Sequence, residues 1–204
     1  VRTAALITNM DSPLGSAVGN SLEVIESVDI LKGNTSGDLW TVCRELSCRM
    51  LMLAGIGDRD ECGRLVDEAV KSGEALKRFE MMVKLQGGDV SYIEDTSKFR
   101  KASFSREVYA PADGYITHMD SEKIGLTAVL LGAGREKKED NINHAAGIMI
   151  AAKTGDFVKR GELLATLFAD NKSRLDGAES RYLSAVSIGD KKPAEQPMIL
   201  DYID

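Results

Sequence analysis

The chain has 204 residues and carries 26 Lys and Arg against 32 Asp and Glu, a formal net charge of −6. Apolar residues make up 43% and charged residues 28% of the sequence, a composition typical of a globular protein with a buried core. No apolar run approaches the roughly 20 residues that a membrane helix needs. The net acidity argues against nucleic acid as the main partner. The length allows one large domain or two small ones.

The first half of the sequence is predicted to contain one strand followed by several helices. The run at residues 3–9 predicts a buried strand. We expect Asn20 to cap the first helix, with Glu23 as its capping-box partner. Apolar stripes and turn residues predict helices over residues 20–33 and 38–53, and a third helix that starts near Asp58 or Asp60 and ends at residue 87.

From about residue 100 the apolar pattern changes to that of strands and turns. A strand–turn–strand segment is predicted over residues 108–116. Further strands are predicted over residues 147–153, 157–158, 162–168 and 198–203, and helices over residues 120–131 and 173–186. The polar stretch at residues 89–101 separates the two halves. The predicted fold class is therefore a helix-rich α/β region followed by an α+β domain dominated by strands.

The cysteines and histidines give little support for metal or nucleophile chemistry. Cys43, Cys48 and Cys62 lack Cys-x-x-Cys spacing, and we interpret them as thiols of a reducing compartment. His118 and His144 have no recognisable carboxylate and nucleophile nearby, so we predict structural roles. A Ser-His-Asp or Cys-His site stays open, because such groups meet only in the fold.

Two glycines begin a pattern that resembles a dinucleotide-binding fingerprint. Gly132 and Gly134 fit its first two positions, but Lys137 stands where the third glycine belongs. The segment also follows a predicted helix, whereas the fingerprint follows a strand. We interpret the glycines as a helix-terminating turn, and the mixed-sign run at residues 135–140 as a solvated surface.

The loop at residues 13–17 precedes a helix that carries Glu23 and Glu26. A tight turn exposes backbone carbonyls, and a carboxylate a few residues later can complete an oxygen-rich site for potassium or calcium. The alternative is that Glu23 caps the helix and Glu26 lies on the surface. The spacing alone leaves both interpretations open.

Several collinear segments resemble the bacterial pyrimidine-nucleoside and thymidine phosphorylases. They are Asn9–Gly15, Gly19–Val24 with Glu26, Gly114–Ile116, Leu130–Arg135 with Lys138–Asp140, Ala146–Ile148, and Lys153–Asp156 with Lys159–Glu162. The resemblance covers nearly the whole chain and corresponds to about the last half of the family's protein. It implies that residues 1–95 are the C-terminal part of the family's central α/β domain. Residues 102–204 would then be its C-terminal domain, with a barrel-sandwich-like β core.

The resemblance implies a cytoplasmic pentosyltransferase of nucleoside salvage. In this family inorganic phosphate attacks C1′ of a pyrimidine nucleoside and releases the free base and a pentose 1-phosphate. The family's phosphate- and base-binding segments precede residue 1, so the resemblance assigns no catalytic or substrate-binding residue here. We therefore expect the chain alone to be inactive. A thymidine-specific enzyme is an alternative within the same family.

The resemblance also implies a cation and an oligomer. A potassium ion would be bound by the backbone carbonyls of Leu14 and Ala17 and by the carboxylate of Glu26, with its remaining ligands outside the chain. The family forms homodimers through helices that likewise precede residue 1. No nucleic acid or membrane is expected as a partner.

A second class of function is suggested by residues 109–114 and 154–164, which resemble half-motifs of biotinyl or lipoyl carriers. A carrier needs a modifiable lysine at a hairpin tip. No Met-Lys-Met or Asp-Lys-Ala segment lies between the two pieces. The alternative is therefore a non-catalytic structural or interaction module.

Overall fold

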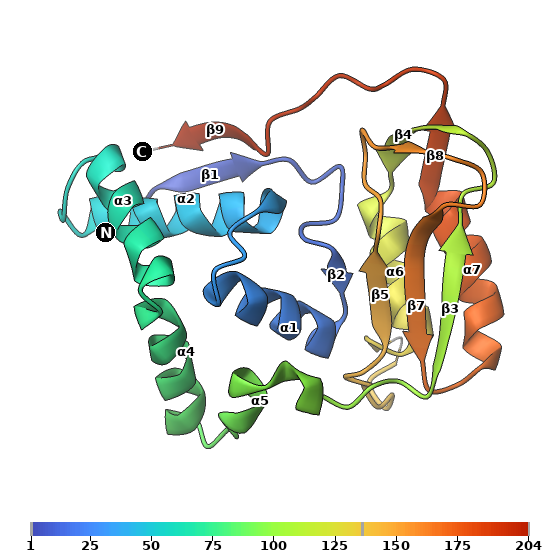
Figure 1. The fold of residues 1–204 in the computed structure, drawn as a ribbon, viewed down its shortest axis with the longest axis horizontal. Coiled ribbons are helices and arrows are strands. Elements are labelled where there is room, and N and C mark those ends of the chain that lie inside the picture. Colours follow the sequence, from blue (N-terminus) through green and yellow to red (C-terminus); the bar gives the residue numbers. More distant parts are fainter. Residues whose placement is uncertain (1, 136, 204) are drawn as a thin grey trace. The chain divides into compact units, whose positions relative to one another are not determined.

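The computed structural model describes residues 2–135 and 137–203, which divide into two compact units (Figure 1). The first unit is built from the described residues of Val1–Asn9, Ile25–Lys98 and Gln196–Asp204. The second unit is built from Met10–Val24 and Phe99–Glu195. The domain division that the resemblance implies, residues 1–95 and 102–204, stays a prediction.

Helices dominate the first unit. They are α2 (Gly37–Leu53), α3 (Arg59–Lys71), α4 (Glu74–Leu85), the short α5 (Ser91–Glu94) and a 3-10 turn at Thr96–Lys98. The strand β1 (Ala5–Thr8) pairs antiparallel with β9 (Ile199–Ile203), as Figure 1 shows. The strands predicted near both ends of the sequence and the helix predicted from residue 38 are thus confirmed, whereas α5 and the 3-10 turn were not predicted. The predicted burial of the first strand is wrong, because the residues of β1 alternate between exposed and half-buried.

The helix predicted over residues 58–87 is wrong in one respect, because the structure divides it into α3 and α4. Of the two predicted starts, Asp58 is the cap of α3, and its carboxylate accepts a hydrogen bond from the N–H of Glu61 at 2.8 Å. The break comes at Gly73, whose φ of 78° lies in the left-handed region. A right-handed helix cannot pass through that conformation, and glycine adopts it without strain.

The predicted N-cap of the first helix is also corrected. The helix α1 spans Asn20–Leu31. The Glu23 carboxylate accepts a hydrogen bond from the N–H of Gly19 at 2.8 Å, one residue before the predicted cap. The Asn20 side chain instead donates from Nδ2 to the carbonyl of Ala133 at 2.8 Å. Asn20 therefore ties the start of α1 to another part of the second unit.

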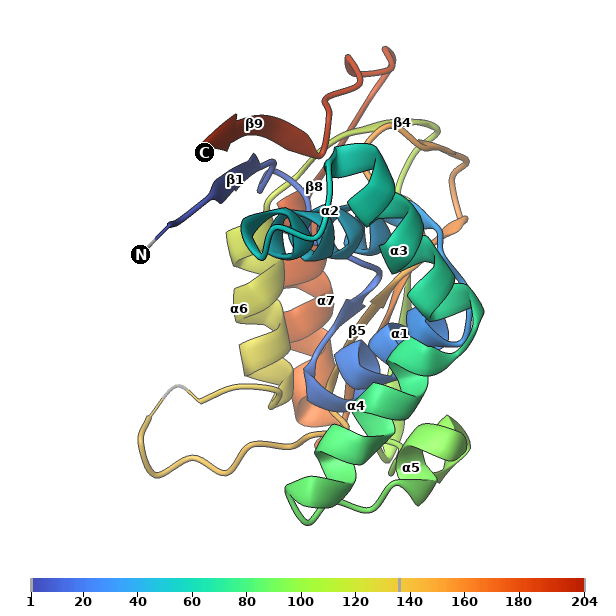
Figure 2. The same cartoon turned by 90° about the vertical axis from the view of Figure 1, so that its left-hand side faces the viewer.

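The second unit contains two antiparallel sheets. One has the strand order β2 (Ala17–Val18), β5 (Gly147–Ile150), β7 (Leu163–Ala169) and β3 (Phe104–Tyr109). The other has the order β6 (Phe157–Val158), β4 (Gly114–Met119) and β8 (Val186–Gly189). Figure 2 shows α6 (Ser121–Leu131) beside α7 (Ser173–Ala185). Among the described residues neither sheet closes into a barrel. A mixed fold of helices and sheets is confirmed, and β2 and β8 are strands that the sequence did not predict.

The core of the second unit lies between its helices and sheets. Ala165, Leu167 and Ala169 occupy every second position of β7 and are buried, as one face of a strand requires. On α7 the buried residues Leu175, Ala178, Tyr182 and Ala185 recur at steps of three and four, which makes one helix face. The same apolar cluster includes Ile148 of β5, so the strand that pairs with β2 is fixed by the core behind it.

Candidate functional site

The loop that precedes β2 and the first residue of β2 each carry one of the three predicted cation ligands. Leu14 lies in this loop with 43% of its surface exposed, and Ala17 is buried in β2. The N–H of Ile150 donates to the carbonyl of Ser16 at 2.8 Å, and Ala17 pairs with Met149. In an antiparallel ladder successive residues turn their backbone groups alternately toward and away from the partner strand. The Ala17 carbonyl therefore points away from β5, the direction that a cation ligand at this sheet edge needs.

Side chains that follow β5, and one from α6, hold the segment of residues 10–18, which we call the 10–18 loop. From α6, the hydroxyl of Ser121 donates to the carbonyl of Met10 at 3.0 Å. The ammonium of Lys153 donates to the carbonyls of Pro13 at 2.7 Å and Gly15 at 2.8 Å. The hydroxyls of Ser12 and Thr154 are 2.9 Å apart. The sequence had placed Lys153 only within a segment of family resemblance. No local pattern could have found this contact, because 138 residues separate Lys153 from Gly15.

The third predicted ligand, Glu26, lies in α1 and is half-buried. Among residues 2–135 and 137–203 no group of three or more His, Cys, Asp or Glu side chains is placed to hold a metal ion. The predicted donors are two carbonyls and one carboxylate, which are hard oxygen ligands suited to alkali and alkaline-earth cations. Joint ligation by Leu14, Ala17 and Glu26 stays a prediction, since the structure describes Glu26 in a different unit.

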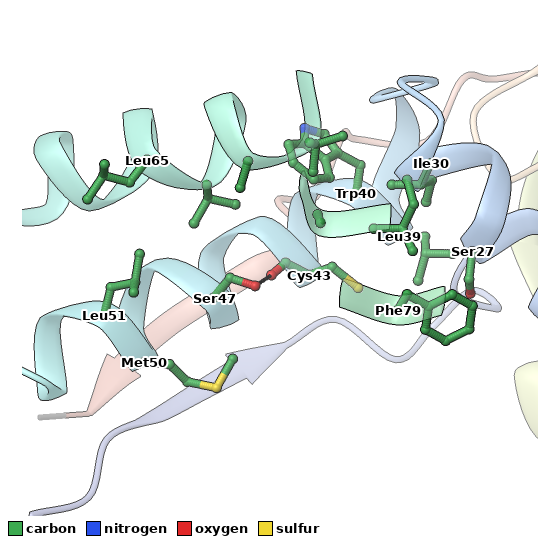
Figure 3. A pocket seen from close by; sticks show the side chains of 15 residues that line it. Ser27, Ile30, Leu39, Trp40, Cys43, Ser47, Met50, Leu51, Leu65 and Phe79 are labelled. Atoms are coloured by element: carbon green, nitrogen blue, oxygen red, sulfur yellow. Dashed lines mark hydrogen bonds between the residues drawn. The ribbon is translucent and has the colours of Figure 1, made fainter. Parts of the chain in front are cut away.

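The first unit has an apolar groove of about 660 Å³ (Figure 3). Helices α1 to α4 line it, mostly with aliphatic and aromatic side chains such as Trp40, Leu65 and Phe79. Cys43 lines the groove, and partial desolvation there raises the pKa of its thiol although the residue as a whole is exposed. Among the described residues, none that lines the groove carries a charged side chain. The lining can therefore contact an apolar surface.

A hydrogen-bonded network fixes the loop before β5 and the end of β7. Asn143 donates from Nδ2 to Asp170 at 3.0 Å, and Arg100 donates to both Asn143 and Asp170 at 2.6 Å. The N–H and hydroxyl of Ser103 donate to the other Asp170 oxygen at 2.8 and 3.0 Å. The Arg100 guanidinium, followed by the Ser103 N–H, holds the pKa of Asp170 well below its usual range. This arrangement satisfies both carboxylate oxygens and indicates a structural role.

The lowered pKa of Asp170 predicts a pH-dependent contribution to stability. The contribution is fully present above the unfolded pKa of about 4 and is lost as the pH falls from there toward the native value. Asp170→Asn should therefore lower the free energy of unfolding at pH 7, and the gap to the wild type should narrow below about pH 4. Urea unfolding at a series of pH values measures this gap. A gap that stays constant from pH 7 to pH 3 would contradict the prediction.

The glycines that resembled a dinucleotide-binding motif end a helix, as expected. Gly132 follows α6 with φ of 112°, and its N–H donates to the carbonyl of Val129 at 2.9 Å. In the mixed-sign run at residues 135–140, Glu136 lies outside the described residues.

Of the cysteines, Cys48 and Cys62 are buried and Cys43 is exposed. Within the described ranges, no helix combines the length and apolar character needed to cross a membrane.

Comparison with known proteins shows which proteins the chain is similar to. Residues 115–189 match the pyrimidine nucleoside phosphorylase C-terminal domain. The pyrimidine-nucleoside phosphorylase of Bacillus subtilis (strain 168) is 42% identical over 173 residues, which are 84% of this chain and 40% of that protein. The corresponding protein of Geobacillus stearothermophilus is 36% identical over 200 residues, or 98% of this chain and 46% of the relative.

The pyrimidine-nucleoside phosphorylase of Staphylococcus aureus (strain USA300) is 38% identical over 189 residues, 92% of this chain and 43% of its own length. The chain thus spans less than half the length of each of these three relatives. The likeness extends well beyond residues 115–189 and includes most of both units. Most of the chain is therefore similar to proteins named pyrimidine-nucleoside phosphorylase, and residues 115–189 match the C-terminal domain of that family.

Proposed function

We propose that this chain is part of an enzyme that cleaves a pyrimidine nucleoside with inorganic phosphate, a pentosyltransferase of nucleoside salvage. The products would be the free base and ribose or deoxyribose 1-phosphate. The observation that carries the proposal is the 36–42% identity to proteins named pyrimidine-nucleoside phosphorylase over 84–98% of the chain. Uridine, thymidine or both are candidate substrates, and a thymidine-specific enzyme is the narrower alternative.

The chain alone is proposed to be inactive. Phosphorolysis needs donors that cradle phosphate and stabilise the charge developing on the leaving base. The groove of the first unit is apolar, and the relatives are more than twice as long as the segments that match this chain. Phosphate and nucleoside contacts are therefore proposed to come from the rest of the enzyme.

A potassium site is proposed as the contribution of this chain to the active enzyme. Its ligands would be the carbonyls of Leu14 and Ala17 and the carboxylate of Glu26. The outward direction of the Ala17 carbonyl at the edge of β2 supports it, as does the oxygen-only donor set. The residues of this chain would bind the cation. The bound cation would supply electrostatic and geometric support for the phosphate-binding segment.

The finer architecture is part of the same proposal. The first unit would correspond to the remainder of the family's central α/β domain, and the second would contain the barrel-sandwich-like C-terminal domain. The whole enzyme would be a cytoplasmic homodimer whose dimer contacts lie outside this chain. The match of residues 115–189 to the family's C-terminal domain supports the assignment of the second unit.

Phosphorolysis assays test the proposed activity. The whole enzyme should release uracil from uridine or thymine from thymidine only when inorganic phosphate is present, and the 204-residue chain should release neither base. Chromatography of the free bases measures both reactions. Base release without phosphate, or no release from either nucleoside by the whole enzyme, would contradict the proposed reaction. Release by the chain alone would contradict its proposed inactivity.

A further inference from the structure

The positively charged side chain of Lys153 binds two backbone carbonyls of the 10–18 loop. Its ammonium donates to the carbonyls of Pro13 at 2.7 Å and Gly15 at 2.8 Å, and its side chain is partly buried. Hydrogen bonds from a charged donor are about twice as strong as those between neutral groups. The two carbonyls are therefore held toward one fixed cationic group.

The segment that carries Lys153 is itself rigid. The N–H of Lys153 donates to the Asp156 carboxylate at 2.8 Å, and the N–H of Asp156 donates back to the Lys153 carbonyl at 3.0 Å. The N–H of Ile116 in β4 donates to the Asp156 carbonyl at 2.9 Å. The ammonium is thus presented by a turn that is closed on itself and anchored to a sheet strand.

The two carbonyls that Lys153 binds flank Leu14, whose own carbonyl is the proposed cation ligand. Gly15, with φ of 71°, takes a left-handed conformation that lets the chain turn sharply after Leu14. Fixing the carbonyls on both sides restricts the rotation of the peptide groups between them, and with it the direction of the Leu14 carbonyl. The other carbonyl ligand, Ala17, is fixed separately by the pairing of β2 with β5.

We propose that Lys153 is a positioning residue for the cation site: its ammonium, without binding the cation, sets the direction of the Leu14 carbonyl. The role rests on the proposed function, since the potassium site is part of it. In the whole enzyme the loss of Lys153 would weaken potassium binding even though every ligand remains.

Hydrogen–deuterium exchange in potassium-free buffer tests the positioning on the 204-residue chain. Lys153→Met should speed exchange of the amides of residues 14–18 at least about tenfold, because it removes two charge-assisted hydrogen bonds that hold the loop. Lys159→Met, which removes an exposed lysine nearby, should leave these amides unchanged. Lys153→Arg keeps a long cationic donor and should retain part of the protection. Equal exchange in Lys153→Met and wild type overturns the proposal.

Rubidium binding by the whole enzyme separates this inference from the cation site itself. The wild type should bind rubidium, and Lys153→Met should bind it at least about tenfold more weakly, in line with the loss of both hydrogen bonds. If the wild type binds rubidium and Lys153→Met binds it equally well, the positioning role is overturned while the cation site stands. If the wild type binds none, both the cation site and the role of Lys153 in it are overturned, although the exchange result can still show that Lys153 holds the loop.

Discussion

Gly19→Ala should lower the free energy of unfolding by about 4 kcal/mol, the sum of backbone strain and overpacking, each about 1–3 kcal/mol. Gly19 has φ of 141°, a conformation that residues with a Cβ rarely adopt. A Cβ added there would lie 2.5 Å from the carbonyl oxygen of Ala146 and 2.9 Å from the Cα of Gly147. Both neighbours are backbone atoms, so relief requires α1 and β5 to move apart. The pairing of β2 with β5 should weaken with that movement.

Gly33→Ala is the matched control for Gly19→Ala. Gly33 follows the other end of α1 with φ of 110°, and nothing lies within 4 Å of a Cβ placed on it. Gly33→Ala should lower the free energy of unfolding only by the cost of backbone strain, about 1–3 kcal/mol. Urea unfolding of the two variants measures the difference. If both variants lose the same unfolding free energy, the contacts of a Cβ at residue 19 with Ala146 and Gly147 add nothing to the cost of backbone strain.

Glu45→Gln should cost about 2 kcal/mol of unfolding free energy, between the values for exposed and fully buried ion pairs, because Glu45 and Arg49 are largely buried whereas the Arg59 side chain is 56% exposed. Glu45 is 4% exposed on α2. Its carboxylate accepts hydrogen bonds from Nε of Arg59 at 3.1 Å and Nη2 at 2.9 Å, and lies 3.6 Å from Nε of Arg49. The amide would leave the Arg49 guanidinium, largely buried, without the counter-charge of Glu45.

The same change should loosen the C-terminal strand. The guanidinium carbon of Arg49 lies 4.3 Å from the ring centre of Tyr202 in β9, and that of Arg59 lies 5.6 Å away. Hydrogen exchange of residues 199–203 should therefore speed up in Glu45→Gln together with the loss of stability. The buried carboxylate thus links α2 and α3 to the β1–β9 pair through two arginines.

Asp67→Asn is the control for the buried carboxylate. Asp67 also binds an arginine with both oxygens, at 2.6 and 2.7 Å from Arg44, but its side chain is 48% exposed. Solvent screening limits such pairs to about 0–1 kcal/mol. Chemical unfolding should therefore rank Glu45→Gln well below Asp67→Asn in stability. The reverse order, or equal stability, would show that burial does not make Glu45 the critical carboxylate.

The sequence predicted elements whose signals are local. The helix found at Asn20–Leu31, the helix start at Asp58 and the helix end at Gly132 all depend on residues a few positions apart, and all lie within two residues of a predicted position. The break at Gly73 was missed because the apolar stripe continues across it, while the left-handed conformation of one residue decides the path of the chain. The two-residue strand β2 is too short to show a pattern of its own.

The environment of the candidate site could be predicted only in part, because it depends on contacts between distant residues. The sequence pointed to Leu14, Ala17 and Glu26 by chemistry and by family resemblance. It did not indicate that Lys153 contacts Pro13 or that Asn143 contacts Asp170. Each of these contacts joins residues that lie far apart along the chain. The close approach of Gly19 to Gly147 likewise requires the fold, because glycine is common in turns that pack against nothing.

Anomalous diffraction from crystals of the whole enzyme grown with rubidium in place of potassium tests the central claim most directly. The claim is that this chain contributes cation ligands, while the substrate contacts come from elsewhere. We predict a rubidium peak bounded by the carbonyl oxygens of Leu14 and Ala17 and the carboxylate of Glu26, and its loss in Glu26→Ala. No peak there at a rubidium concentration that supports activity, or a peak unaffected by Glu26→Ala, would contradict the proposed ligand set.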